Sequence, residues 1–472
     1  MSERADGRDP LSGAIRHKLA SVPEPAIQHL MGVKGQQRRP SFGSPRYVDR
    51  LVTYVRGRRI VRNLGPGLIT GAADDDPSGI AAYSQAGAAF GFNMLWTMPV
   101  LYPLMSTMQF ISAWVGRVTG HGLAANMRRV FPSWVVAGLI GLLVLANTIN
   151  IGADLAAMGA AAELVTGLSR HPMTMLFACA TIALQVFIPY HRYVHFLKFL
   201  TLALFAYFGV VLAVDVDWSE VMRRTLVPQL TWTAGAATTV VAVFGTTISP
   251  YLLFWQASEE VEDEDVDPDD DNAPLMTDPQ QAPQQLQRIK TDTFIGMAFA
   301  NLTAYFIILT TAATLHATGK TDIETSAEAA EALRPIAGDF AFALFSLGII
   351  GTGLLAVPVL AGSAAYAVCE AKGWKAGLER KPKEAIGFYS VIAASIVLGI
   401  AVDYSPLDPI KALFWSAVIN GVVSVPLMFA MMIIVSRHNQ MGRFTASLRL
   451  RILGWLATSV MAAAAILMVA VV

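Results

Sequence analysis

The chain alternates between long apolar runs and short polar stretches from residue 60 or so to its end. A helix crosses a bilayer with roughly 17 to 25 apolar residues, and by this measure the runs predict about eleven membrane-spanning helices. We place them at residues 64–88, 93–117, 133–167, 171–190, 194–214, 234–258, 291–317, 338–371, 385–403, 408–436 and 450–471. The pattern therefore predicts an all-α, polytopic membrane protein.

The composition agrees with this prediction. Of the 472 residues, 54% are hydrophobic and only 15% are charged, whereas soluble proteins carry about 25% charged residues. The 35 basic and 35 acidic residues balance, so the net charge gives no reason to expect a nucleic-acid partner. Cys179 and Cys369 lie in apolar runs without the spacing of a zinc site, and we interpret them as core residues. The sequence contains no pair of nucleophile and base and no cofactor motif, so we expect neither an enzyme nor a bound cofactor.

Lysine and arginine residues set the predicted orientation. Residues 1–60 are polar and rich in arginine, and we expect them to form a disordered cytosolic tail. With this tail inside, the cytosolic connections carry basic residues such as Arg128 and Arg129, while VDYSPLDP on the opposite side carries none. Because cytosolic loops have an excess of basic residues, we predict a cytosolic N-terminus and an external C-terminus.

One predicted cytosolic connection, residues 259–290, is acidic instead and contains EEVEDEDVDPDDDN. Low hydrophobicity and like charges are typical of a solvated, disordered linker. Clustered carboxylates also suit hard cations, so a low-affinity collector or sensor of divalent ions is the alternative interpretation.

The stretch AADDDPSGIA, residues 72–81, interrupts the first apolar run. An acidic residue at the centre of a lipid-facing helix costs about 2.5 to 3.5 kcal/mol, so three in a row argue against an ordinary span. Pro77 removes a backbone donor, and nearby glycines weaken the helix further, which predicts a break near residues 74–79. Broken backbone at membrane depth is found only where it lines a cavity inside the protein. Its free carbonyls, together with a carboxylate, predict a cation site.

A matching break is predicted five spans later, in FGTTISPYLLFW at residues 244–255, where Pro250 lies in another apolar run. Many transporters consist of two inverted repeats whose broken helices meet at the middle of the membrane. We therefore predict a first five-helix repeat at 61–232, a second, inverted repeat at 233–436, and an additional membrane helix within 437–472.

These two breaks carry a specific resemblance. LGPGLITGAADDDPSGIAAYSQAGAAFGFNMLW is similar to the first span of the natural-resistance-associated macrophage protein (Nramp) family of divalent metal transporters, with its pattern GPG, DPGN and QAGAxFGxxxLW. GTTISPY resembles that family's GATxMPH. The resemblance implies the LeuT-type (amino-acid–polyamine–cation transporter) architecture, with discontinuous helices 1 and 6 around the metal. It places Asp76 on the metal-binding aspartate, and Ala73 and Thr246 on the two backbone carbonyl donors.

Two departures from the family pattern concern the choice of metal. Gly79 replaces the family's asparagine, and Ser249 replaces its methionine. Thioether sulfur selects softer ions, whereas carboxylate, carbonyl and water suit Mg²⁺, Ca²⁺ and Mn²⁺. Shorter side chains at both positions are expected to leave room for Mg²⁺, which usually keeps several waters. The DPSGI and TTISPY forms resemble the prokaryotic branch called Nramp-related magnesium transporters, which implies transport of Mg²⁺, with Mn²⁺ possible, across the bacterial inner (plasma) membrane.

Asp74 and Asp75 precede the predicted ligand, where the family has other residue types. Two interpretations stay open for them. They attract the hydrated ion or hold its outer-shell waters, or one or both cap the broken helix or pair internally.

A third departure concerns proton coupling. The proton-using family members carry an acidic pair on the third span and a histidine after the sixth-span Met-Pro. In ANTINIGADLAAMG our alignment places Asn147 and Asn150 on the acidic pair, and Tyr251 takes the histidine position. Amides do not titrate, and an unperturbed tyrosine does so only near pH 10, so the usual proton route is predicted to be lost. Asp154 and Glu163, further along this span, are the nearest titratable residues.

The sequence thus predicts import of hydrated divalent ions by alternating access, driven by the membrane potential without protons. A divalent cation gains about 4.6 kcal/mol per 100 mV, twice the single-charge value. Asn420 on the tenth span is a further pathway candidate, with polar packing as the alternative. The other functions considered are a proton-coupled Mn²⁺/Fe²⁺ transporter and, from another class, a membrane metal-sensing receptor. The expected partners are the ion and the lipid bilayer; protein partners stay open.

Overall fold

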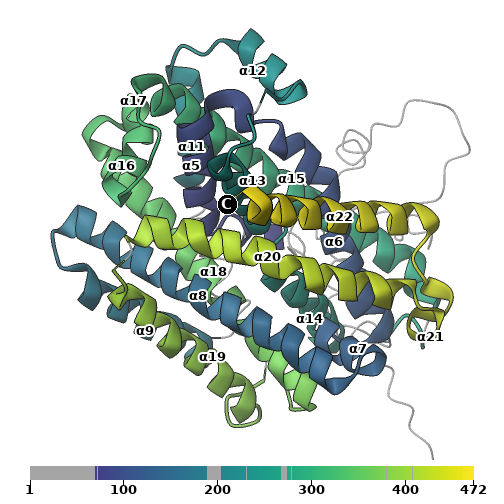
Figure 1. Ribbon diagram of the computed structural model, residues 1–472. Helices are drawn as coiled ribbons and strands as arrows, with labels where there is room; N and C mark the ends of the chain where they lie inside the picture. The colour runs from purple at the N-terminus through teal and green to yellow at the C-terminus, as the bar shows by residue number, and fades with distance from the viewer. Residues whose placement is uncertain are drawn as a thin grey trace, which may run out of the picture. The chain divides into compact units, whose positions relative to one another are not determined.

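The computed structural model describes residues 70–71, 73–188, 203–229, 231–266, 274–277, 279–378, 380–406 and 408–471. The predicted tail at 1–60 lies outside these residues. The described part of the chain contains helices and no β-strand, as predicted (Figure 1). The first half contains α5 (Pro77–Phe90), η1 (Gly91–Met94), α6 (Thr97–Thr119), α7 (Leu123–Val130), α8 (Ser133–Thr166), α9 (Arg170–Phe187), α11 (Phe205–Ala213) and α12 (Trp218–Leu226), where η marks a 3₁₀ helix.

The second half begins with a broken helix and ends with α22. It contains α13 (Ala234–Thr247), α14 (Pro250–Val266), η3 (Pro279–Gln281), α15 (Ala282–Thr314), η4 (His316–Thr318), α16 (Ser326–Ala330), η5 (Glu331–Leu333), α17 (Arg334–Ala337), η6 (Gly338–Phe340), α18 (Ala341–Lys372), α19 (Ile386–Gly399), η7 (Ile400–Tyr404), α20 (Pro409–Ser436), α21 (His438–Met441), η8 (Gly442–Phe444) and α22 (Leu448–Val471).

Seven helical segments of the described residues are long and apolar enough to cross a membrane. They contain α8, the broken helix α13–α14, α15, α18, α19, α20 and α22. Helices α6 and α9 occupy the second and fourth predicted spans, α5 is the part of the first span after its break, and the fifth span lies partly outside the described residues. The predicted number of about eleven spans therefore stays a prediction.

Both predicted breaks are present and lie inside the protein. Helical backbone ends at Asp74 and resumes with α5 at Pro77, while α13 ends at Thr247 and α14 starts at Pro250. The most apolar stretch of Ala234–Glu262 is 94% buried, compared with 22% for α22. Because protein surrounds the broken helix, its interrupted backbone is not exposed to lipid.

The packing agrees with two repeats of five helices. Helix α8 is the third predicted span of the first half, and it packs along α18, the third predicted span of the second half. Helix α5 packs against α13. Helix α9 packs on α8, and α19 packs on α18. In Figure 1, α20 runs beside α8, with α22 on its other side.

Short helix α7 is held by a side chain from another helix. The Glu370 carboxylate at the end of α18 accepts hydrogen bonds from the backbone N–H groups of Ala124 and Ala125, at 3.1 and 3.3 Å, and from the Ser258 hydroxyl at 2.8 Å. Gly122, at the N-cap of α7, brings no side chain, and a Cβ there would lie 1.9 Å from Glu370 Oε1. Glu370 therefore takes over the capping role and joins α7 to α14 and α18.

The acidic segment predicted as a linker is helical at both ends. Residues 259–266 continue α14, and 279–290 belong to η3 and α15. The buried Glu260 forms an ion pair with Arg288 of α15 at 2.6 Å, and Glu262 accepts a hydrogen bond from Tyr366 of α18. The prediction of a disordered linker across 259–290 is therefore wrong for these ends, because partners distant in sequence stabilise the helix.

Candidate metal site

Asp76 lies at the break of the first helix and caps α5. Its backbone is extended, and its Oδ1 accepts hydrogen bonds from the Gly79 N–H and the Ser78 hydroxyl, both at 2.7 Å. Aspartate at the N-cap followed by proline at the first helical position is a favoured start of a helix. The sequence Asp-Pro-Ser-Gly thus fixes where the helix resumes and how the carboxylate is turned.

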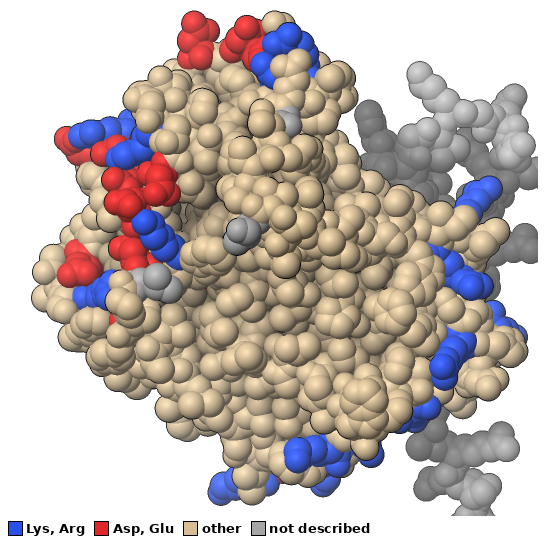
Figure 2. Space-filling model, in the orientation of Figure 1, with Lys and Arg blue, Asp and Glu red and all other residues tan. Residues whose placement is uncertain are grey.

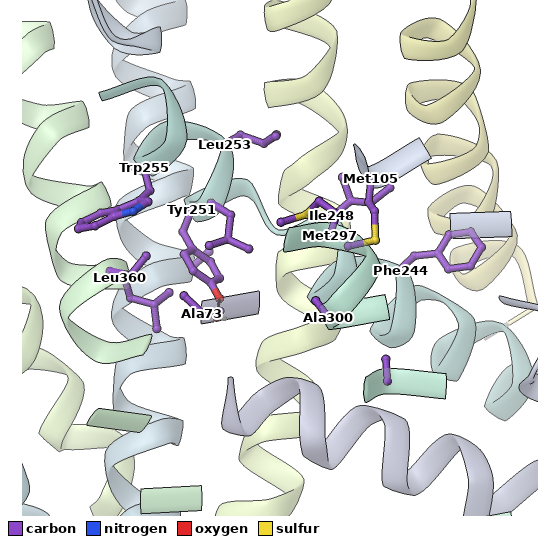
Figure 3. Packing of buried hydrophobic residues seen from close by; sticks show 14 of the residues in the cluster. Ala73, Met105, Phe244, Ile248, Tyr251, Leu253, Trp255, Met297, Ala300 and Leu360 are labelled. Carbon is purple, nitrogen blue, oxygen red and sulfur yellow. Dashed lines mark hydrogen bonds between the residues drawn. The ribbon is translucent and has the colours of Figure 1, made fainter. Parts of the chain in front are cut away.

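The other oxygen of Asp76 faces the neighbouring helices. Oδ2 lies 3.2 Å from the Asn150 amide nitrogen of α8 and 3.2 Å from the Tyr251 hydroxyl of α14. The same hydroxyl lies 3.1 Å from the Ala73 carbonyl oxygen, toward which it points in Figure 3. Asp76 is 1% exposed. A carboxylate and a carbonyl oxygen therefore lie side by side in a buried site. A cation that displaces the Tyr251 hydroxyl can bind both oxygens.

The second break adds further carbonyl groups. The Ser249 hydroxyl donates to the Gly245 carbonyl at 3.1 Å and to the Thr246 carbonyl, the donor implied by the family resemblance. The Ser424 hydroxyl of α20 donates to the Ile248 carbonyl at 2.8 Å. These carbonyls lie at the C-terminal end of α13, where the helix dipole is negative and favours a cation. Ser249 therefore brings oxygen to the site where the family motif has sulfur.

Three asparagines from two helices were predicted near the pathway, and their positions differ. Asn150 donates to Asp76, and its carbonyl oxygen accepts from the Asn420 amide at 3.2 Å. Asn147 instead donates to the Leu360 carbonyl of α18 at 2.9 Å. Asn150 and Asn420 thus belong to the polar surroundings of Asp76, whereas Asn147 joins α8 to α18.

The two acidic residues further along α8 also differ. Asp154 is buried, and its Oδ2 lies 3.4 Å from the Asn150 amide nitrogen, so it extends the polar group around Asp76. Glu163 is exposed. Asp154 is therefore the titratable side chain of α8 that the fold brings near Asp76.

Asp74 and Asp75 are 1% and 2% exposed, and each has a carboxylate oxygen without a hydrogen-bond partner among the described residues. Asp75 lies beside Thr303 of α15. The cap of α5 is Asp76, so neither residue takes the capping role considered for them there. Among the described residues, no three carboxylate, histidine or cysteine side chains form a ready metal cluster. The arrangement suits an ion that binds one carboxylate, carbonyls and its own waters.

The space beside Gly79 is filled, in contrast to the expected open volume. A Cβ at residue 79 would lie 3.1 Å from the Thr246 Oγ1 and 3.3 Å from the Tyr83 ring. The prediction that glycine widens the site here is therefore wrong for this conformation, because two neighbours occupy the room.

Hydrogen bonds that the sequence did not predict hold α5 on the side away from the break. The Tyr83 and Thr247 hydroxyls lie 2.9 Å apart and join α5 to α13. The Gln85 amide accepts from the Ile323 N–H at 2.9 Å and donates to the Thr321 carbonyl at 3.2 Å. Gln85 belongs to the QAG motif, but its partners lie in a connection whose course no local pattern predicts.

The side of the break before Asp74 is closed as well. The Thr70 hydroxyl donates to Gln256 of α14, and the Gln256 amide lies 3.4 Å from Glu260, which pairs with Arg288 of α15. Contacts therefore close the site toward both ends of the broken helices. The structure shows an enclosed state of the site.

Known proteins resemble this chain in sequence. The family model described as natural resistance-associated macrophage protein-like (Nramp) matches residues 67–471. The chain is 26% identical to the divalent metal cation transporter MntH of Burkholderia ambifaria over 408 residues, which cover 84% of this chain and 86% of the relative. It is 28% identical to the protein of the same name from Yersinia pestis over 298 residues, 62% of this chain and 68% of the relative.

Solved structures share the fold at low sequence identity. The Eremococcus coleocola manganese transporter, in complex with an aromatic bis-isothiourea substituted compound, superposes with a TM-score of 0.67 at 14% identity, covering 94% of this chain and 90% of that one. Mhp1, a nucleobase-cation-symport-1 family transporter in a closed conformation, superposes with a TM-score of 0.53 at 15% identity, covering 87% and 93%. The predicted LeuT-type fold is therefore confirmed.

Proposed function

The chain belongs to the natural resistance-associated macrophage protein-like family and is a multi-pass membrane transporter of divalent metal cations, and we propose that its preferred cargo is hydrated Mg²⁺. We further propose that transport is driven by the membrane potential and moves no protons. The setting we propose is a bacterial inner membrane.

The observation that carries the proposal is the set of groups around Asp76. Its Oδ2 meets an amide and a phenol hydroxyl, and the neighbouring break carries the Ser249 hydroxyl. These contacts are made by oxygen and nitrogen, without the sulfur that would favour a softer ion. One carboxylate with carbonyl oxygens and retained waters is the usual environment of Mg²⁺.

The proposed mechanism is alternating access around the two breaks. The ion reaches Asp76 with part of its water shell, and the Tyr251 hydroxyl turns away from the Asp76 and Ala73 oxygens that it contacts in the enclosed state. Rocking of the broken helices then opens the opposite side and releases the ion. The membrane potential supplies about 4.6 kcal/mol per 100 mV for a divalent cation, so no second ion is needed.

The absence of proton movement rests on the residues that contact Asp76. Asn150 is an amide and does not titrate, and Tyr251 takes the position of the family's histidine. Neither group exchanges a proton near neutral pH in its ordinary range.

The test is Mg²⁺ uptake into proteoliposomes with a negative interior potential, with the internal pH recorded and Asp76→Ala as the control. We expect uptake without acidification, and loss of uptake in the variant. Entry of Mn²⁺ together with protons, without entry of Mg²⁺, would refute the proposal.

A matched variant tests the choice of ion directly. Ser249→Met returns a thioether to the site and should raise Mn²⁺ uptake relative to Mg²⁺, because sulfur favours the softer ion. Ser249→Ala removes the hydroxyl without adding sulfur and controls for its loss. An equal Mn²⁺ to Mg²⁺ ratio in both variants would show that residue 249 does not select the ion.

A second candidate is a proton-coupled manganese transporter. One observation favours it: the buried Asp154 carboxylate lies 3.4 Å from the Asn150 amide, which also contacts Asp76, so a titratable group lies near the site. This candidate predicts acidification that Asp154→Asn abolishes, whereas the favoured proposal predicts no acidification in either protein.

A further inference from the structure

We infer that the side-chain hydroxyl of Thr246 is an oxygen donor to the transported ion, in addition to the carbonyl of the same residue. The inference rests on the proposed function only in that Asp76 binds a divalent cation. It does not depend on whether that cation is Mg²⁺ or Mn²⁺.

The first observation is that this hydroxyl has no partner. Thr246 is 1% exposed, and its Oγ1 makes no hydrogen bond with any described residue. A buried hydroxyl without a partner costs about 1–3 kcal/mol, so native proteins rarely leave one unbonded without a function.

The second observation is that many other buried threonines among the described residues satisfy their hydroxyl groups within their own helices, although the Thr293 hydroxyl of α15 also has no partner there. A threonine in a helix commonly donates to the carbonyl four residues earlier. The next residue, Thr247, does so with Val243 at 2.7 Å, and the same bond is made by Thr107, Thr119, Thr311 and Thr352. Thr246 makes no such bond. Its hydroxyl therefore stays available at the last turn of α13.

The third observation is where the hydroxyl lies. The position that a Cβ would take at Gly79 is 3.1 Å from the Thr246 Oγ1 and 3.4 Å from the Asp76 Oδ1. The hydroxyl of α13 and the carboxylate at the start of α5 thus flank one point beside the break. Glycine at residue 79 permits this approach, because any side chain there would crowd the hydroxyl.

The chemistry fits a hard divalent cation. A hydroxyl is a neutral oxygen donor of the kind that Mg²⁺, Ca²⁺ and Mn²⁺ accept, directly or through a bound water. Thr246 then contributes two oxygens from α13, opposite the Asp76 carboxylate and the Ala73 carbonyl. An ion that binds both broken helices favours one relative position of the two helices. Alternating access requires such a coupling between ion binding and helix position.

The experiment measures uptake kinetics of Thr246→Val and Thr246→Ser in proteoliposomes. Valine keeps the shape and removes the hydroxyl, and we expect it to raise the KM for the ion about tenfold. Serine keeps the hydroxyl and should restore a KM close to that of the parent protein. An unchanged KM in Thr246→Val, or equal effects of both substitutions, would overturn the inference.

Changes at Gly79 provide an independent arm. Gly79→Ala places a methyl group 3.1 Å from the hydroxyl and should also raise KM, by displacing it. The Thr246→Ala background lacks the hydroxyl that a side chain at residue 79 would crowd, and there Gly79→Ser returns a hydroxyl from the opposite helix; the contact with the Tyr83 ring is common to both double variants. We expect Thr246→Ala/Gly79→Ser to have a lower KM than Thr246→Ala/Gly79→Ala. Equal KM values for the two double variants would contradict a donor role for the hydroxyl.

Assays with two different ions distinguish failure of this inference from failure of the proposed function. Every variant is assayed with Mg²⁺ and with Mn²⁺. If the parent protein carries only Mn²⁺, the magnesium proposal fails, and the contrast between valine and serine measured with Mn²⁺ still decides the role of Thr246. If the parent carries Mg²⁺ and the contrast is missing, only the inference about Thr246 fails.

Discussion

The two oxygens of Asp76 face different groups. Oδ1 accepts the hydrogen bonds that start α5, while Oδ2 faces Asn150 and Tyr251. One side chain therefore shapes the helix and offers the negative charge for the ion. Substitutions that keep or remove its hydrogen-bonding capacity can separate the two roles.

Asp76→Asn and Asp76→Ala should both abolish uptake, because each removes the carboxylate charge. Only alanine also removes the helix cap, so it should lower the free energy of unfolding by about 1 kcal/mol more than asparagine does. Uptake assays and thermal unfolding in detergent measure the two effects. Equal stability of the two variants would mean that the cap contributes nothing.

The sequence located Asp76, Ala73 and Tyr251 because their motifs lie at the two breaks. It could not rank Asn147, Asn150 and Asp154, which follow one another at helical spacing on α8. Residues three or four apart lie on one side of a helix, and a small rotation decides which of them faces a given neighbour. The structure turns Asn150 to Asp76, Asn147 to α18, and places Asp154 behind Asn150.

At the scale of elements, α5 forms hydrogen bonds with neighbouring elements on several sides. Tyr83 joins it to α13, Gln85 joins it to the connection before α16, and the His316 ring nitrogen lies 2.7 Å from the Ala88 carbonyl. These contacts hold α5 in the enclosed state. We expect opening of the site past α5 to break these contacts.

Tyr83→Phe removes one of these hydrogen bonds, the 2.9 Å contact with the Thr247 hydroxyl, and should favour opening between α5 and α13. We expect a cysteine at residue 249, in a protein lacking Cys179, to react severalfold faster with a charged thiol reagent. Thr458→Val, on α22, where the hydroxyl donates to the Gly454 carbonyl of the same helix, serves as the control. A reaction rate unchanged by Tyr83→Phe would show that this contact does not limit opening.

A second prediction at this scale concerns α7. Glu370→Ala leaves the N–H groups of Ala124 and Ala125 without their acceptor and should cost about 1 kcal/mol of unfolding free energy. Glu370→Gln keeps an acceptor oxygen and should cost less, as measured by thermal unfolding. If glutamine costs as much as alanine, the charge of Glu370 matters and its capping bonds do not.

Elements could be predicted from the sequence where local chemistry decides them. Proline places both breaks correctly, since Pro77 and Pro250 each start the helix that follows. The end of α14 could not be predicted, because Glu260 and Glu262 find partners on α15 and α18, far away in sequence. Local composition predicts a solvated linker, and tertiary contacts override it.

At the scale of the whole molecule, charge is distributed unevenly over the described residues. In the view of Figure 2 the acidic side chains gather toward the end where α12 and α16 lie, with several lysine and arginine side chains among them, and the rim near α7 and α21 shows lysine and arginine without acidic side chains. Glu328 lies in α16 and forms an ion pair with Lys320, and Arg128 lies in α7. Basic residues favour the cytosolic side, so this distribution supports the predicted orientation.

The orientation predicts that the C-terminus is external. An epitope added after Val472 should bind antibody in intact cells whose outer membrane is permeabilised, and an epitope before Met1 should not. Reversed labelling would place the acidic end in the cytosol and contradict the predicted orientation. Labelling of both ends after lysis controls for epitope exposure.

Because Asp76 starts α5, binding of the ion to Asp76 also stabilises the folded protein. A ligand that binds only the native state raises stability in proportion to the logarithm of its concentration, by about 2.7 kcal/mol at a hundredfold excess over its Kd. The melting temperature of the protein should therefore rise with free Mg²⁺ and stay constant in Asp76→Ala. Heating the protein with one salt after another then ranks the ions by affinity, without a membrane, a gradient or any movement of cargo.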